Sequence, residues 1–405
     1  MSSRSLHVES LGEKAISDLA VEIIERKGKG HPDSLIDGAS EAVSIALCEY
    51  YLKEFGSILH HNVDKGLLVG GRSEVRFGGG EVLEPIQIVV AGRATSSVKR
   101  NGGRYDVPVG ELAVSAINNF LNRTMRFLDA ETHVITDFKI RPGSADLVGV
   151  YGANGKLPLS NDTSIGVGYS PLTPAEKLVL ESERLLNSSK VKHEMPELGE
   201  DIKVMALRNG AKIDLTIAAA MISKLIPDQS HYASIVEQTQ REVDDLVPKI
   251  TDMDVTVRVN SGDSYSNGVY YLTITGTSAE AGDDGNTGRG NRPNGLITSM
   301  RQYSMEATAG KNPVNHTGKI YNVLAQTTAD RIFREVKGIK EAYVRLLSRI
   351  GVPIDIPQIA SAAIVLEKGS RVESVRSDIE SIMDEELSKI TDVTSLILSG
   401  TVTLF

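Results

Sequence analysis

The chain has 405 residues, of which 40% are hydrophobic and 24% are charged. This length allows two or three domains, and the composition is that of an ordinary soluble globular protein. The formal net charge of −9 argues against nucleic acid or an anionic membrane as the main partner. The single cysteine, Cys48, excludes an intrachain disulfide, and its apolar helical surroundings predict a buried, unreactive thiol. No signal-peptide pattern or membrane-spanning stretch is seen, so we expect a cytoplasmic protein.

A short predicted strand, 21–24, leads through a turn into a predicted helix. Apolar residues between positions 35 and 50 recur at helical spacing, and Gly56 is placed to end the helix. At the other end, Asp33 or Ser34 could cap the first turn. The sequence therefore predicts a helix that begins directly after a turn rich in glycine and lysine.

That turn, KGKGHP, is a candidate anion site. It carries Lys27, Lys29 and His31 to the N-terminus of the predicted helix, where free N–H groups and the helix dipole favour an anion. The alternative is a capped helix with exposed lysines. His31 and Asp33 together go beyond what capping requires, which favours the anion site.

The next block, HHNVDKGLLV, ends in an apolar strand at 67–69 that we expect to be buried. Its adjacent histidines, His60 and His61, would point to opposite faces of a strand, so we predict no metal site there. Asp64 is the better functional candidate, as an acceptor for a ribose hydroxyl or an amine.

Strands are predicted at 85–91 and 132–140, with a helix at 109–127 between them. The polar, glycine-rich segment 92–107 has no period. It is either a linker or a mobile lid.

Two further places offer groups that could bind a ligand. Gly143 and Ser144 allow a close approach to a ligand, and Asp146 adds a carboxylate at the end of the same turn. Farther along, Asp201 and Lys203 are two residues apart on a predicted strand and so share one face.

The sequence of the second half of the chain predicts helices and strands in an irregular order. A capping box at Thr173 starts a helix at 173–186, Asn209-Gly210 joins the strands of a hairpin, and a second hairpin is predicted at 266–268. Further helices are predicted at 230–246, 322–336 and 372–390, and strands at 255–259 and 360–366. This irregular alternation favours an α+β fold of mixed sheets covered by helices over a doubly wound parallel sheet.

The stretch from 281 to 319 concentrates groups suited to a magnesium-bound polyphosphate. Its glycines free backbone N–H groups for an anion, and Asp283 and Asp284 are adjacent hard oxygen ligands. Its cations are Arg289, Arg292, Arg301, Lys311 and Lys319. A solvated loop with scattered charges is the alternative. The stretch matches neither a Walker A loop nor an EF-hand.

Two anion-binding turns that combine carboxylates with cations fit a nucleoside triphosphate with magnesium. Phosphoryl transfer would add a base for the attacking hydroxyl, and no obvious one is present. If the whole triphosphate were the leaving group, cations and one donor such as His31 would suffice. The residues alone do not decide which bond breaks.

Five motifs resemble the S-adenosylmethionine synthetase family in its archaeal form: GKGHPDSLIDG, GSADL, GEDIKVM, GDDGNTGRGNRPNGLIT and SMEATAGKNPVNHTGKIYN. The resemblance covers essentially the whole chain. It implies that methionine sulfur attacks C5′ of ATP and that the tripolyphosphate that leaves is hydrolysed to pyrophosphate and phosphate. It also implies Mg²⁺ and K⁺ as cofactors.

The resemblance assigns roles by motif. His31 would stabilise the leaving oxygen, Arg289 and Lys311 would hold the tripolyphosphate, and Asp33 would bind magnesium. Further ATP or phosphate contacts would come from Lys29, Gly143, Ser144, Asp146, Asp201, Lys203, Asn315 and Lys319. Asp64 and Asp283 would face methionine or adenosine, and Glu49 would mark the potassium site.

The chain departs from the bacterial and eukaryotic pattern at four positions: Ser34, Gly290, Asn315 and Thr317. The last stands where that pattern has a metal-binding aspartate. Our hypothesis is that Asp284 supplies the second metal ligand. Lys29 and Lys319 are candidates for the missing cations.

The resemblance further implies three similar α+β domains around a pseudo-threefold axis, with 92–107 as a lid. The expected grouping is 25–110 with 276–320 for ATP and phosphate, 1–24 with 147–275, and 111–146 with 321–405. Two subunits would share active sites as a homodimer. The alternatives are a magnesium-dependent phosphotransferase and a catalytically silent nucleotide sensor.

Overall fold

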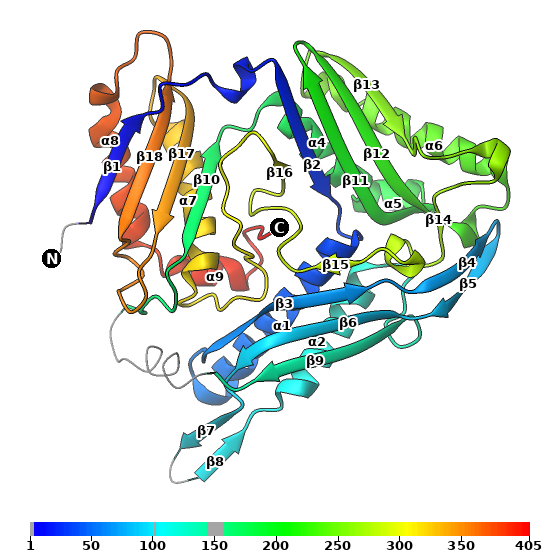
Figure 1. Ribbon diagram of the computed structural model, residues 1–405, viewed down its shortest axis with the longest axis horizontal. Coiled ribbons are helices and arrows are strands. Elements are labelled where there is room, and N and C mark those ends of the chain that lie inside the picture. The colour runs from blue at the N-terminus through cyan, green and yellow to red at the C-terminus, as the bar shows by residue number, and fades with distance from the viewer. Residues whose placement is uncertain (1–3, 101–102, 144–156) are drawn as a thin grey trace.

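The computed structural model describes residues 4–100, 103–143 and 157–405, which form three main β-sheets with helices packed on them (Figure 1). Each sheet combines parallel and antiparallel neighbours or strands from distant parts of the chain. This confirms the expected α+β class with mixed sheets. No helix in the described ranges is long and apolar enough to cross a membrane.

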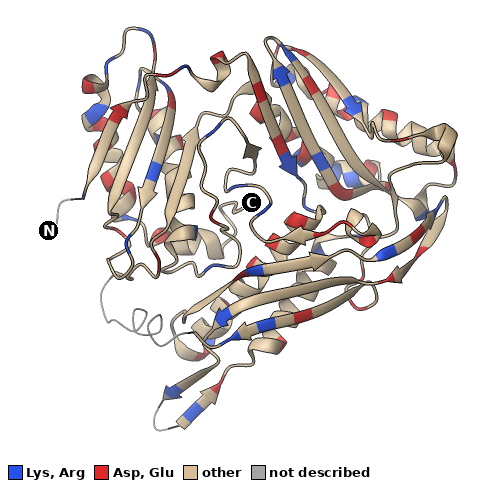
Figure 2. Ribbon diagram, viewed as in Figure 1, with Lys and Arg blue, Asp and Glu red and all other residues tan. Residues whose placement is uncertain are grey.

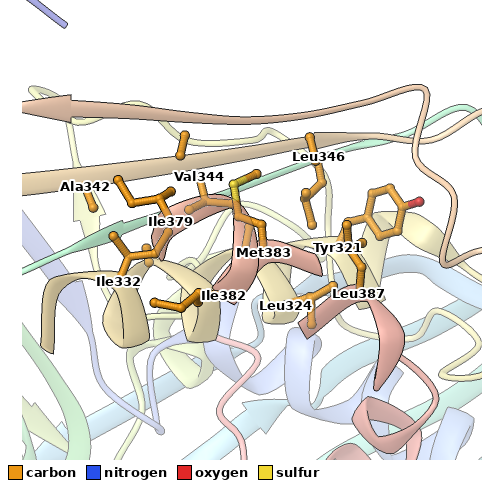
Figure 3. Packing of buried hydrophobic residues seen from close by; sticks show 14 of the residues in the cluster. Tyr321, Leu324, Ile332, Ala342, Val344, Leu346, Ile379, Ile382, Met383 and Leu387 are labelled. Atoms are coloured by element: carbon orange, nitrogen blue, oxygen red, sulfur yellow. The ribbon is translucent and has the colours of Figure 1, made fainter. Parts of the chain in front are cut away.

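Sheet A contains strands from both ends of the chain, in the order β1-β18-β17-β10. β1 runs parallel to β18, and the other neighbours are antiparallel. The bounds are β1 Leu6–Ser10, β10 Ile165–Ser170, β17 Ile339–Leu347, β18 Ile359–Leu366, α7 Thr317–Glu335, α8 Val372–Ser388 and α9 Asp392–Leu398. Figure 3 shows its core, in which Leu324 and Ile332 of α7 meet Val344 of β17 and Met383 of α8.

Sheet B has the order β13-β12-β11-β2-β16, and β14 pairs with β12. Its bounds are β2 Val21–Lys27, β11 Leu198–Asn209, β12 Lys212–Ile222, β13 Asp254–Val259, β14 Leu272–Thr273 and β16 Ile297–Thr298. The helices of this part are α4 Pro174–Leu186, α5 Ser189–Glu194 and α6 Gln229–Asp244. The hairpin at Asn209-Gly210 and the capping box at Thr173 are both confirmed.

Sheet C has the order β15-β3-β6-β9 and is covered by α1 and α2. Its bounds are β3 His61–Val69, β6 Ile86–Ala94, β9 Val134–Arg141, β15 Gly285–Asn286, α1 Pro32–Phe55 and α2 Val109–Thr124. Two hairpins extend beyond it in Figure 1: β4 Arg72–Arg76 with β5 Gly79–Glu84, and β7 Ser97–Arg100 with β8 Gly103–Asp106. The segment 92–107 therefore contains strands, although its sequence shows no strand period.

Two local predictions are wrong. The cap of α1 is His31 rather than Asp33 or Ser34, because the His31 ring accepts the hydrogen bond from the Asp33 N–H. The strand at 67–69 is not buried throughout: Leu68 is buried, whereas Leu67 and Val69 are 42% and 37% exposed. One face of β3 packs on helices and the other faces outward, as alternation along a strand requires.

The hairpin predicted at 266–268 is also wrong as a sheet element. The turn is present, and Ser264 and Val269 form an isolated antiparallel bridge across it. β13 and β14, however, do not pair with each other, and each runs parallel to β12. Three strands of sheet A were not predicted: β1, β10 and β17. The last is one of the two inner strands of sheet A, and its nearly continuous burial removes the alternation that marks a half-buried strand.

The strand pairs join segments that the expected domain grouping separates. β1 and β10, which were grouped with sheet B, lie in sheet A beside β17 and β18. β9, which was grouped with the C-terminal part, lies beside β6 in sheet C. The expected domain boundaries stay a prediction, and the sheets divide the chain differently at these strands.

Candidate active site

The turn before α1 is held against β11. The Gly30 N–H donates to the Glu200 carbonyl at 3.1 Å. A Cβ at Gly30 would lie 2.5 Å from the backbone N of Asp201, so only glycine allows this approach. The contact fixes the position of the next residue, His31.

His31 caps α1 with its ring. Its Nδ1 accepts a hydrogen bond from the Asp33 N–H at 3.2 Å, so the neutral ring carries its proton on Nε2. Burial lowers the pKa of His31, the Asp201 carboxylate opposes that shift, and the Lys27 ammonium adds to it. His31 therefore offers a neutral Nε2–H donor at neutral pH.

Carboxylates gather around this helix start. Asp201 is buried, and its Oδ2 accepts hydrogen bonds from the Ser278 N–H at 2.8 Å and the Ser278 hydroxyl at 2.7 Å. The same hydroxyl lies 3.0 Å from Oδ2 of Asp283. Burial raises the pKa of Asp201, and the nearby His31 ring and the two hydrogen bonds from Ser278 oppose that shift. Asp201 and Asp283, which were predicted from separate motifs, thus meet through Ser278 beside His31.

Asp33 ties the glycine-rich segment to the start of α1. Its Oδ2 accepts from Lys27 Nζ at 2.7 Å, and its Oδ1 accepts from the Asn286 N–H at 2.8 Å. Lys27 Nζ also donates to the Arg289 carbonyl at 3.1 Å. Figure 2 shows basic and acidic residues side by side here, where β2 ends and β11 and α1 begin. The two candidate anion turns, far apart in sequence, therefore form one site.

Arg289 is exposed at the edge of a cavity of about 250 Å³. The cavity is lined by Lys27, Gly288, Arg289, Gly290, Arg292, Ile297, Thr298, Tyr303 and Met305. It has a basic side and an apolar side. On the neighbouring strand, Lys203 Nζ lies 3.2 Å from Glu25 Oε1.

Lys311 lies in a second charged group. Its Nζ pairs with Glu306 and lies 3.8 Å from Asp64 Oδ2, and Asp64 Oδ1 accepts from Lys65 Nζ at 2.5 Å. Lys311 and Asp64 are both buried. The structure thus brings these two predicted residues together, and carboxylates compensate the charge of Lys311.

Lys319 is fully buried, and its Nζ donates to both oxygens of Glu41 at 2.7 Å. Its role as a phosphate contact stays a prediction. Asn315 is buried as well, and its Oδ1 has no hydrogen-bond partner among the described residues.

Other predicted residues take no part in the contacts described so far. Lys29 and Asp284 are exposed, and Asp284 Oδ1 accepts from the Gly70 N–H at 2.8 Å. Glu49 is exposed on α1, 16 residues after Asp33 and so about 24 Å farther along the helix. Gly143 follows β9, and the predicted contacts of Ser144 and Asp146 lie outside the described residues.

The sequence reasoning missed four acidic or polar side chains of this region: Asp37, Glu41, Ser278 and Glu306. The signal for the first two was present, because Asp33, Asp37 and Glu41 recur every four residues and so share one face of α1. Ser278 and Glu306 lie in irregular segments, where spacing carries no information about direction.

Comparisons with known proteins match S-adenosylmethionine synthetases over nearly the whole chain. The family model for S-adenosylmethionine synthetase (AdoMet synthetase) matches residues 4–401. An S-adenosylmethionine synthase of Pyrobaculum islandicum is 53% identical over 98% of this chain and 99% of that protein. Those of Caldivirga maquilingensis and Saccharolobus islandicus are each 52% identical, over 100% and 99% of this chain and 100% of both relatives.

Among solved structures, an unusual S-adenosylmethionine synthetase from Campylobacter jejuni has a similar fold, with a TM-score of 0.60 over 93% of both chains and 13% identity. The sequence matches extend through the glycine-rich segment, the start of α1 and all three sheets. The chain belongs to the S-adenosylmethionine synthetase family.

Proposed function

We propose that this chain is a methionine adenosyltransferase, which forms S-adenosylmethionine from ATP and L-methionine. The sulfur lone pair forms the bond to C5′, the C5′–O5′ bond breaks, and its electron pair leaves with the tripolyphosphate. Hydrolysis of the tripolyphosphate to pyrophosphate and phosphate completes the cycle. The names of the relatives that share about half of its residues over their full length support this activity.

The single observation that carries the proposal is the fixed tautomer of His31. Its Nδ1 is occupied by the Asp33 N–H, so Nε2 is left to donate. A donor at the leaving O5′ stabilises the charge that develops as the C5′–O5′ bond breaks. A neutral imidazole gives this stabilisation without carrying a charge in the free enzyme.

The paired lysines suit a ligand that brings metal and phosphate together. Lys27 is held by Asp33, and Lys311 by Glu306 and Asp64. A magnesium-bound polyphosphate can replace both partners, because phosphate oxygens accept from the lysines while the metal takes a carboxylate. Arg289, Lys203 and Lys29 are the further cations for the phosphates, and Asp64 and Asp283 are the acceptors for the methionine ammonium or the ribose.

The acid groups fit Mg²⁺, which usually takes one or two carboxylates and completes its shell with phosphate and water. Phosphate oxygens of the polyphosphate would supply further ligands. Asp33 would hold the ion, with Asp284 as the proposed second ligand. Bound magnesium would neutralise phosphate charge.

Potassium fits less well. The residue matched to its site, Glu49, is exposed and lies about 24 Å along α1 from Asp33. It lines a separate groove with Glu41, Phe120 and Arg123. We therefore derive no step through potassium.

We also propose a homodimer with shared active sites, built from three similar domains in a pseudo-threefold arrangement. Sheets B and C support the dimer, because their outer faces carry exposed apolar side chains. These are Val21, Ile23, Met205 and Leu207 on sheet B, and Leu67, Val69 and Ile135 on sheet C.

The test of the function is a product assay with ATP, L-methionine, Mg²⁺ and K⁺. We expect S-adenosylmethionine, pyrophosphate and phosphate in equal amounts, separated by chromatography. Phosphate transfer without a sulfonium product would indicate a phosphotransferase. ATP binding without any product would indicate a nucleotide sensor, and the role of His31 would then have to be withdrawn.

A further inference from the structure

One face of α1 presents a ladder of three carboxylates: Asp33, Asp37 and Glu41. Residues four apart lie one above the other on a helix, so the three face the same side. Each accepts a backbone N–H from the glycine-rich stretch. The donors are Asn286 for Asp33, Gly288 for Asp37 and Gly310 for Glu41, each at 2.8 Å.

Asp37 is wedged against two glycines that flank Arg289. Its Oδ1 accepts from the Gly288 N–H, and a Cβ at Gly290 would lie 2.6 Å from its Oδ2. Gly288 has a left-handed backbone with φ of +87°, which favours glycine. The backbone on both sides of Arg289 is therefore shaped around this one carboxylate.

Glu41 holds the backbone of the turn that carries Lys311. It accepts from the N–H of Gly310, whose φ is +77° and whose carbonyl accepts from the Val63 N–H at 2.8 Å. Both of its oxygens also accept from the buried Lys319. The charge of Lys319 thus serves to hold Glu41 in place.

A second residue of α1, Ser44, also binds the turn that carries Lys311. The Ser44 hydroxyl lies 2.9 Å from His61 Nε2 and 3.2 Å from the Lys311 carbonyl, and Asn312 Nδ2 lies 3.2 Å from His61 Nδ1. The residues on both sides of Lys311 are therefore fixed to α1 or β3, and only its side chain is left to change partner.

We propose that Asp37 and Glu41 are positioning residues that present Arg289 and Lys311 to a polyphosphate. Carboxyl groups suit this task because their oxygens accept backbone N–H groups, and these hydrogen bonds become shorter and stronger when the carboxyl is ionised. Burial raises the pKa of Asp37 to about 7, and the hydrogen bond from the Gly288 N–H and the charge of Arg292 oppose that shift. Neither Asp37 nor Glu41 touches the phosphate; each acts through the cation that follows its glycine. The inference rests on the proposed function only in that it takes the ligand to be a polyphosphate.

The test measures binding of inorganic tripolyphosphate with Mg²⁺ by isothermal titration calorimetry, without ATP or methionine. We expect Asp37→Ala and Glu41→Ala each to weaken binding roughly tenfold, as the loss of an outer supporting group does at other ligand sites. Asp37→Asn keeps an acceptor oxygen for the Gly288 N–H and should recover most of the affinity.

The matched control is Glu22→Gln. Glu22 is as buried as Asp37 and pairs with Arg208 at 2.7 Å, but it lies at the other end of β2. It should lose comparable stability and keep the affinity for tripolyphosphate. A similar loss of affinity in Glu22→Gln would mean that the effect is general destabilisation, and the proposal would be wrong.

Double variants separate positioning from a direct contact. If Asp37 acts through Arg289, Asp37→Ala should cost little further affinity once Arg289→Ala is present, and Glu41→Ala should cost little once Lys311→Ala is present. Additive losses in both pairs would overturn the proposal. Because the readout is tripolyphosphate binding, failure to form S-adenosylmethionine would refute the proposed function without deciding this inference.

Discussion

At the scale of single residues, His31 combines two tasks that substitution can separate. It caps α1 through Nδ1, and we assign Nε2 to the leaving oxygen. His31→Ser keeps a good cap acceptor but is too short to reach that oxygen. We expect its kcat to fall about 10²- to 10³-fold, the usual cost of losing one donor to a developing oxyanion, with ATP affinity little changed.

The measurement is steady-state kinetics together with ATP binding and thermal unfolding. His31→Ala, which lacks the cap as well, should lose about 1 kcal/mol more stability than His31→Ser but show the same kcat. If His31→Ser kept the kcat of the unchanged chain, Nε2 would have no part in the reaction.

A second residue gives the protein a pH dependence outside the site. Lys192 is buried, and its Nζ donates to the Gly199 carbonyl at 2.5 Å. Burial lowers the pKa of Lys192 from 10.5 to about 7; Glu200 and Glu183 oppose the shift, and Arg126 and Lys29 reinforce it. Between pH 7 and 10.5 the unfolded chain therefore binds more protons than the folded one.

The contribution of Lys192 to the free energy of unfolding rises with pH across that window, because Lys192 loses its proton at a higher pH in the unfolded state than in the folded state. The measurement is denaturant unfolding of both proteins at pH 7 and pH 10. Between these two pH values the free energy of unfolding of the unchanged chain should rise by up to about 4 kcal/mol relative to that of Lys192→Met. A difference between the two proteins that stays constant with pH would show that Lys192 has an ordinary pKa.

At the scale of secondary-structure elements, the sequence predicted those with local signals. The capping box at Thr173, the Asn209-Gly210 hairpin and the apolar stripe of α1 each depend on residues within one or two turns, and each is confirmed. β17 was missed because a strand buried on both faces shows no alternation, and one of its charged residues, Glu341, is buried and paired with Arg301.

The candidate site shows the limit of local reasoning more sharply. Its two anion turns were predicted from glycines and charges, but the bond from Asn286 to Asp33 spans 253 positions. Nothing in the spacing within either segment tells which carboxylate meets which N–H. The regular recurrence of Asp33, Asp37 and Glu41 was visible in the sequence. Acids on a helix usually form a solvated face, however, so the contacts of these three with backbone N–H groups could be found only in the structure.

At the scale of the whole molecule, long-range pairing decides the architecture. β1 pairs with β18 and β6 with β9, both in parallel, and such pairs need connections that leave no turn signature in sequence. The mixed-sheet class followed from the irregular order of helices and strands. The assignment of segments to sheets did not, which is why the expected grouping differs from the sheets at β1, β9 and β10.

The outer face of sheet B makes the proposed homodimer testable. Ile23 of β2 and Leu207 of β11 are direct partners in register, and they are 41% and 43% exposed. An exposed apolar pair on neighbouring strands suits burial against a second copy, since burying apolar surface favours association. A charge placed there would have to be desolvated in the dimer.

Leu207→Glu should therefore convert the dimer to monomer in multi-angle light scattering, while leaving the thermal unfolding of the monomer nearly unchanged, because the side chain is already exposed there. Leu52→Glu is the matched control, since Leu52 is 42% exposed but lies on α1, away from the sheet faces. It should stay dimeric. If the active site is shared between subunits, monomeric Leu207→Glu should also lose S-adenosylmethionine synthesis. An active monomer would show that one chain holds the complete site, and a dimeric Leu207→Glu would place the subunit contact on another surface.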